Sequence, residues 1–160
     1  MVILGIDPGI GRMGWGIVKV HSSQFTVHSY GCIETDAKQK NEERLLQIYK
    51  EITSIIKKYK PDVLAIEELF FGTNSKTALV VGQARGVVLL CAGQHNLPVS
   101  VYTPLQVKMA LTGYGRAEKN QIGQMVKILL KLDSVPKLDD TADALAVAIT
   151  HALSAKMSML

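Results

Sequence analysis

The sequence predicts a single α/β domain over residues 1–160, with a five-stranded mixed sheet flanked by helices. A length of 160 residues is typical of one domain, and 48% hydrophobic residues are enough to fill a core. Three strand-like segments come first, and strands then alternate with helical segments. This order favours a mixed sheet covered by helices.

The first half of the chain supplies four strands and one helix. Residues 2–7 are almost entirely apolar, which is typical of a strand buried on both faces. Residues 14–20 and 24–34 are predicted as two further strands. Residues 42–59 carry apolar side chains at helical spacing, and Pro61 follows their end. Residues 62–69 (DVLAIEEL) then predict a second buried strand, which ends in acids.

The second half is mainly helical, with helices predicted over residues 75–95, 104–111, 118–132 and 139–154 and a fifth strand over 98–102. Residues 78–92 are the one candidate for a membrane span. They are too few, and Gln83 and Arg85 interrupt them. We therefore expect a buried helix and no association with a membrane.

Charge and cysteine content indicate the kind of partner and the compartment to expect for the protein. The formal net charge of +4 favours an anionic partner, although weakly. Cys32 and Cys91 form no CxxC pair, which favours buried thiols in a reducing cytosol. The first acid already occurs at Asp7, so no signal peptide is indicated, and we expect a cytoplasmic protein.

Acidic residues at the ends of predicted elements are the main functional signal. Asp7 ends the first strand, Glu67 and Glu68 end the fourth, and Asp140 and Asp143 lie three residues apart at the start of the last helix. Buried carboxylates that gather repel one another, and a divalent cation removes that cost. Mg²⁺ prefers oxygen ligands of this kind. The pattern predicts an acidic metal site.

Two assignments stay open on the residues alone. Glu67 and Glu68 are adjacent in a strand, so only one of them can face the same side as Asp7, and spacing does not say which. Asp140 fits the role of a helix cap as well as that of a metal ligand.

The order of elements is that of the ribonuclease-H-like fold, and the motifs resemble one family within it. GIDPG, AIEELFF, GQARG, QVK, AEK and DDTADALAVAITH, in this order, resemble the RuvC family of Holliday-junction resolvases from residue 3 to about 151. The resemblance implies a homodimeric, Mg²⁺-dependent endonuclease of homologous recombination and DNA repair. Such an enzyme makes paired symmetric nicks in a four-way DNA junction and leaves 5′-phosphate and 3′-hydroxyl ends.

The resemblance also implies roles for particular residues. It places the catalytic, metal-binding carboxylates on Asp7, Glu67, Asp140 and Asp143, and so chooses Glu67 over Glu68. Two Mg²⁺ ions per site are expected, with Mn²⁺ as a substitute. The resemblance places DNA-binding residues at Phe70, Lys108 and Lys119. Without the resemblance, the sequence would favour ordinary solvated side chains for both lysines. The resemblance further implies a bacterial, nucleoid-associated protein that works with the RuvA–RuvB branch-migration complex.

Assembly and alternative functions complete the sequence predictions. Gly82 and Gly86 form a small-xxx-small pair that would let the helix over 75–95 meet its copy in a two-fold dimer. One alternative is a junction-binding protein of the same fold without catalysis. Another is a related nuclease that acts on other nucleic acids.

Overall fold

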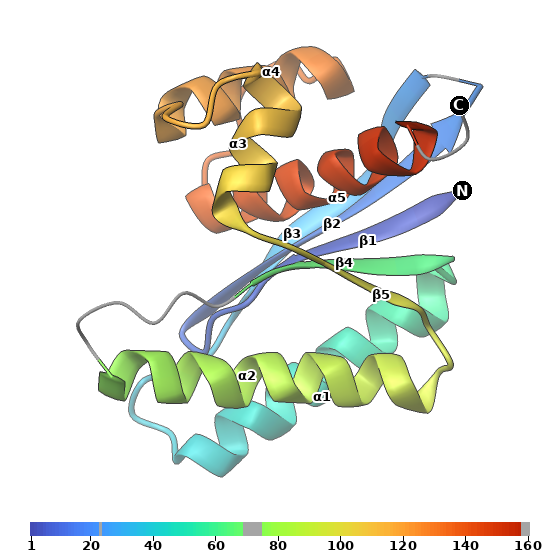
Figure 1. The fold of residues 1–160 in the computed structure, drawn as a ribbon. Coiled ribbons are helices and arrows are strands. Elements are labelled where there is room, and N and C mark those ends of the chain that lie inside the picture. Colours follow the sequence, from blue (N-terminus) through green and yellow to red (C-terminus); the bar gives the residue numbers. More distant parts are fainter. Residues whose placement is uncertain (23, 69–74, 158–160) are drawn as a thin grey trace.

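The computed structural model describes residues 1–22, 24–68 and 75–157, and all the predicted strands and helices are present within them (Figure 1). β2 begins two residues before its predicted start, and β4 ends at Glu67. The elements are β1 (Val2–Asp7), β2 (Arg12–His21), β3 (Gln24–Glu34), α1 (Asn41–Tyr59), β4 (Val63–Glu67), α2 (Ser75–Gln94), β5 (Val99–Tyr102), α3 (Pro104–Thr112), α4 (Lys119–Leu130) and α5 (Asp139–Met157).

The sheet has the strand order β3-β2-β1-β4-β5, which puts β1 at its centre. β1, β2 and β3 pair antiparallel, whereas β4 runs parallel to both β1 and β5. The prediction of a mixed five-stranded sheet is therefore confirmed. Because β1 and β4 are parallel neighbours, their carboxyl ends, Asp7 and Glu67, meet at one edge of the sheet.

Helices cover both faces of the sheet (Figure 1). α5 packs along β1 and β2 on one face, with α3 and α4 beside it, and α1 and α2 lie together on the other face. Side chains alternate between the two cores: Ile3 of β1 belongs to the α5 side, while Leu4 and Ile6 belong to the α1–α2 side. This alternation decides which acids face α5.

Helix α2 differs from the buried helix that the sequence predicts. Ala84 and Val88 are fully buried against the sheet, but Leu79 and Leu90 are 65% and 56% exposed. By length and composition, Lys76–Gln94 could cross a membrane, and only 22% of this stretch is buried. The prediction was wrong because the segment is apolar around most of its circumference, and such a pattern does not show that only one side is covered.

Helix α5 lies unusually close to the centre of the sheet. A Cβ atom added at Gly14 of β2 would collide with the backbone carbonyl of Asp140, and one added at Gly5 of β1 would collide with that of Ala144. Only glycine fits such an approach without displacing the helix. Gly14 pairs with Asp7 across the antiparallel ladder. The start of α5 is thereby held next to the end of β1.

Candidate active site

Strand alternation directs Asp7 and Glu67 to the same side of the sheet. Val63 and Ala65 of β4 pack in the α5 core, and Leu64 and Ile66 pack in the α1–α2 core. Glu67 therefore follows Val63 and Ala65 toward α5, as Asp7 follows Ile3. Glu68 follows the other set and is exposed. The orientation left open by the sequence is resolved by which face α5 covers.

The first turns of α5 supply two further acids and meet a lysine from α4. Lys119 Nζ lies 3.0 Å from Asp143 Oδ2 and 3.5 Å from Asp139 Oδ2. Asp139 is largely exposed, whereas Asp143 is mostly buried. Lys119 is therefore paired with the acidic site, although its side chain is 60% exposed.

The upward pKa shift in this cluster is largest at Asp7. Burial, followed by the charges of Asp143, Glu67 and Asp140, raises the pKa of Asp7 from its ordinary value of 3.8 to about 8, despite an opposing effect of Lys119. Without a bound cation, Asp7 is thus mainly protonated at neutral pH. The four predicted carboxylates are close enough to influence one another, and the nearby cations do not cancel their repulsion at Asp7.

The neighbouring groups respond in the same way. Burial, then the charge of Asp143, raises the pKa of Glu67, while Lys119 and Lys108 oppose the rise. Burial also raises the pKa of Asp143, despite its hydrogen bond to Lys119. For Lys119, burial alone would lower the pKa, but its bonds and attraction to Asp143 and Asp139 raise it overall.

Asp140 contacts a residue that the sequence analysis did not single out. Arg12 Nε lies 3.2 Å from Asp140 Oδ2. This buried oxygen nevertheless has no hydrogen-bond partner among the described residues, so the two charges are near each other without a directed bond. An arginine at the start of a strand, just after a glycine-rich turn, was the available signal. Its partner lies far along the chain and could not be read from spacing.

The donor set fits a divalent cation. It consists of carboxylates, the hard oxygen ligands of Mg²⁺, and includes the unpartnered Asp140 Oδ2 and the protonated Asp7. Among the described residues, no three His, Cys, Asp or Glu side chains are already arranged to hold a metal ion. The chemistry of the donor set nevertheless fits a divalent cation.

A cavity of about 230 Å³ opens beside this cluster, toward α3 and α4. Glu67, Asp143, Lys108 and Lys119 all contribute to its wall. The two lysines predicted to lie near DNA are thus brought to the acids from the helices on this side. A phosphate in this cavity would therefore lie beside positive side chains as well as carboxylates.

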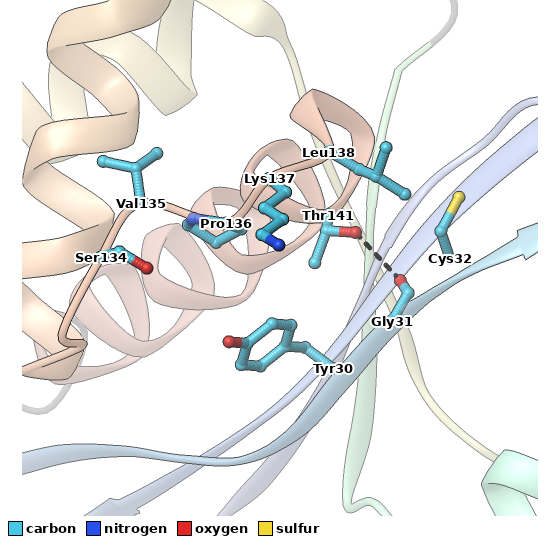
Figure 2. A pocket seen from close by; sticks show the side chains of 9 residues that line it. All are labelled: Tyr30, Gly31, Cys32, Ser134, Val135, Pro136, Lys137, Leu138 and Thr141. Atoms are coloured by element: carbon cyan, nitrogen blue, oxygen red, sulfur yellow. Dashed lines mark hydrogen bonds between the residues drawn. The ribbon is translucent and has the colours of Figure 1, made fainter.

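A second cavity, of about 330 Å³, lies between β3 and the segment that leads into α5 (Figure 2). Tyr30 and Lys137 line it from opposite sides. The Thr141 hydroxyl donates a hydrogen bond of 3.3 Å to the Gly31 carbonyl there. This bond ties the first turn of α5, which carries Asp140, to strand β3.

Other predicted site residues are distributed differently. Phe70, and Phe71 beside it, lie outside the described residues. Gly82 and Gly86 belong to α2, on the opposite face of the sheet from the acidic cluster. A Cβ atom at Gly86 would meet nothing within 4 Å among the residues that the structure describes, so this position is open on the surface of α2.

The mixed five-stranded sheet, with a carboxylate cluster at the ends of its two central parallel strands, defines a nuclease of the ribonuclease-H-like class. The family model described as crossover junction endodeoxyribonuclease RuvC matches residues 3–151. The chain therefore belongs to the RuvC family and is an endodeoxyribonuclease, and the family is one of divalent-metal-dependent nucleases.

Individual relatives agree with this assignment over the whole chain. The crossover junction endodeoxyribonuclease RuvC of Alkaliphilus metalliredigens is 54% identical over 160 residues, which cover 100% of this chain and 98% of the relative. That of Alkaliphilus oremlandii is 58% identical and covers 95% and 93%. The structure of Thermus thermophilus RuvC superposes with a TM-score of 0.92 at 37% identity, over 99% and 97% of the chains. The same protein in complex with a Holliday junction substrate gives 0.91 at 35% identity, over 98% and 96%.

Proposed function

We propose that the protein resolves four-way DNA junctions during recombination and repair, by paired symmetric nicks that leave 5′-phosphate and 3′-hydroxyl ends. Asp7, Glu67, Asp140 and Asp143 are its catalytic, metal-binding residues, with Mg²⁺ as the cation, two ions per site and Mn²⁺ as a substitute. The observation that carries this proposal is the buried carboxylate cluster, in which the pKa of Asp7 is raised to about 8. A protein that only binds phosphate gains nothing from such concentrated negative charge.

The residues of the chain have separable tasks in this reaction. Asp7, Glu67, Asp140 and Asp143 would hold the cations, and bound cations would supply water activation and charge stabilisation for the departing oxygen. Lys108 and Lys119, in the wall of the adjoining cavity, bind the DNA backbone near the cut. Lys119 Nζ also lies 3.0 Å from Asp143 Oδ2 and so orients this metal-binding carboxylate.

A stacking role for Phe70 remains a prediction from the resemblance. An exposed ring beyond Glu67 would stack on a base unpaired at the crossover, a contact worth about 1–3 kcal/mol. Phe70→Ala should then fold normally and lose much of its cleavage, while Phe70→Trp retains it. A Phe70→Ala protein that melts several degrees lower, but cuts at the normal rate, would assign the ring to the core instead.

Two copies of the chain would match the two strands that must be cut. We propose a homodimer through α2, in which the exposed Leu79 and Leu90 and the open surface at Gly86 meet their copies beside Gly82. The working complex would include RuvA–RuvB, in the cytoplasm of a bacterium and at its nucleoid. This use of α2 also accounts for an apolar helix side without invoking a membrane.

One gel experiment tests the proposal against its alternatives. The purified protein is given a synthetic four-way junction, a linear duplex and an RNA–DNA hybrid, each with Mg²⁺ and with chelator. We expect Mg²⁺-dependent cleavage of the junction alone. Junction binding without cleavage would indicate a structural protein, and preferred cleavage of another substrate would indicate a different nuclease of the same fold.

A further inference from the structure

Arg12 sits on a fixed base beside the acidic cluster. The backbone before it turns tightly, because a Cβ atom at Gly9 would collide with the Arg12 carbonyl. Thr35 then anchors this turn: its amide donates to the Gly11 carbonyl at 3.0 Å, and its hydroxyl donates to the Ile10 carbonyl. The Arg12 side chain itself is 55% exposed. A guanidinium on a rigid backbone therefore retains freedom to move at its tip.

The pairing of Arg12 with Asp140 is not that of a structural ion pair. Structural arginine–carboxylate pairs are commonly held by one or two directed hydrogen bonds. Here Nε lies 3.2 Å from Oδ2, yet this buried oxygen has no hydrogen bond among the described residues. Lys119, by contrast, is hydrogen-bonded to Asp143. Arg12 thus offsets the charge of Asp140 while leaving its oxygen available.

Arg12 and the lysines of the site lie on different sides of the carboxylates. Arg12 begins β2, on one side of the central strand β1, and Glu67 with its neighbour Lys108 lies on the β4 side. Positive side chains therefore flank the carboxylates on both sides. The planar guanidinium matches the geometry of a phosphodiester better than an ammonium does.

We propose that Arg12 is a positioning residue that exchanges partners: it neutralises Asp140 before a divalent cation binds, and then moves to a backbone phosphate of the cut strand on the β2 side of the site. The proposal rests on the metal site inferred above. It makes two physical demands. Arg12 must compete with the cation for Asp140, and its contact with DNA must appear only once a cation is bound.

The first test measures binding of Mn²⁺ alone, without DNA, by electron paramagnetic resonance. Arg12→Gln should bind Mn²⁺ roughly threefold more tightly than the wild type, because a neighbouring positive charge is removed. Arg12→Lys should behave like the wild type. In an Asp140→Asn background, Arg12→Gln should have a much smaller effect, since only the direct repulsion between Arg12 and the cation is then left to remove. Lys19→Gln, which removes a charge from the distant end of the same strand, is the matched control.

The second test measures junction affinity against salt concentration, in chelator and again in Ca²⁺, with the junction shown intact on a denaturing gel. Loss of one phosphate contact lowers the slope of log affinity against log salt by about one. For Arg12→Gln we expect this loss in Ca²⁺ and no change in chelator. An equal loss under both conditions, or none under either, overturns the exchange, as does unchanged Mn²⁺ affinity.

The same data separate failure of this inference from failure of the proposed function. A wild-type protein that binds neither Mn²⁺ nor a junction would remove both. A wild type that binds both, with Arg12→Gln indistinguishable from Lys19→Gln, would remove only the role of Arg12.

Discussion

At the scale of the residue, the raised pKa of Asp7 connects the active site to the stability of the fold. In the metal-free protein the folded state keeps a proton on Asp7 up to about pH 8, whereas the unfolded chain loses it near 3.8. The folded state therefore binds more protons between these values, and stability falls as the pH rises through this window. A carboxyl needed for chemistry destabilises the metal-free fold at neutral and alkaline pH.

Replacing Asp7 by asparagine should remove this pH dependence. In chelator, the melting temperature of Asp7→Asn relative to the wild type should increase from pH 4 to pH 8 and reach a gain of roughly several degrees. Mg²⁺ should stabilise the wild type more than the variant, because the variant lacks a ligand. Differential scanning calorimetry across this pH range measures both effects. A difference between the two proteins that stays constant with pH would contradict the origin assigned to the shift.

Glu67 and Glu68 offer a matched pair for testing which carboxylate acts. Glu67 faces α5 and has a raised pKa, whereas Glu68 points away from α5 and is exposed. Glu67→Gln should lose junction cleavage by a factor of about 100 or more, because loss of even an outer-shell partner of a metal typically costs about 10–100-fold, while Glu68→Gln should cut at close to the wild-type rate. Single-turnover rates on a labelled junction decide the matter. Equal losses, or a larger loss in Glu68→Gln, would show that the strand is assigned wrongly.

Some residues of the site could be predicted from the sequence and others could not. Asp7 stood out because an acid that ends an apolar strand is costly anywhere in a fold. The direction in which Glu67 points could not be predicted. Val63 to Ile66 are apolar on both faces of the strand, so they do not reveal which face α5 covers. Arg12 was missed for a similar reason, since its contact with Asp140 exists only after β2 and α5 have packed.

At the scale of the element, the close approach of α5 to β2 sets the position of Asp140. Gly14→Ala places a Cβ atom against the Asp140 carbonyl, so the helix start must shift. We expect a loss of about 1–3 kcal/mol in the free energy of unfolding, together with a fall in cleavage at temperatures where the variant is still folded. Gly93→Ala is the control, because its Cβ meets nothing within 4 Å and alanine favours helices. Urea unfolding compares the two, and an unchanged Gly14→Ala would show that α5 can yield there.

Helix α2 shows where element-level prediction stops. Its existence followed from a long apolar run bounded by polar residues, and the structure confirms the helix. Its exposed side, with Leu79 and Leu90, could not be predicted, because a helix that is apolar all round does not indicate which side packs against the sheet.

At the scale of the whole molecule, resolution of a junction requires two cuts made within one binding event. If two chains meet through α2, each brings one acidic site, and both strands are cut before the junction is released. A single chain would cut one strand, dissociate and leave a nick that a ligase can close. Dimerisation would therefore determine the product as well as the rate.

Gly86→Leu tests this link because Gly86 is exposed and a Cβ atom added there meets nothing within 4 Å in the described part of the chain. We expect the variant to fold with a melting temperature close to that of the wild type and to sediment as a monomer at micromolar concentration, in buffer without detergent. On a supercoiled plasmid with an extruded cruciform, the wild type should give mainly linear DNA from paired cuts, whereas Gly86→Leu should give mainly nicked circles. Lys76→Gln, an exposed change on the same helix, serves as the control. A wild type that sediments as a monomer yet linearises the plasmid would show that the two cuts are coupled by another route than α2.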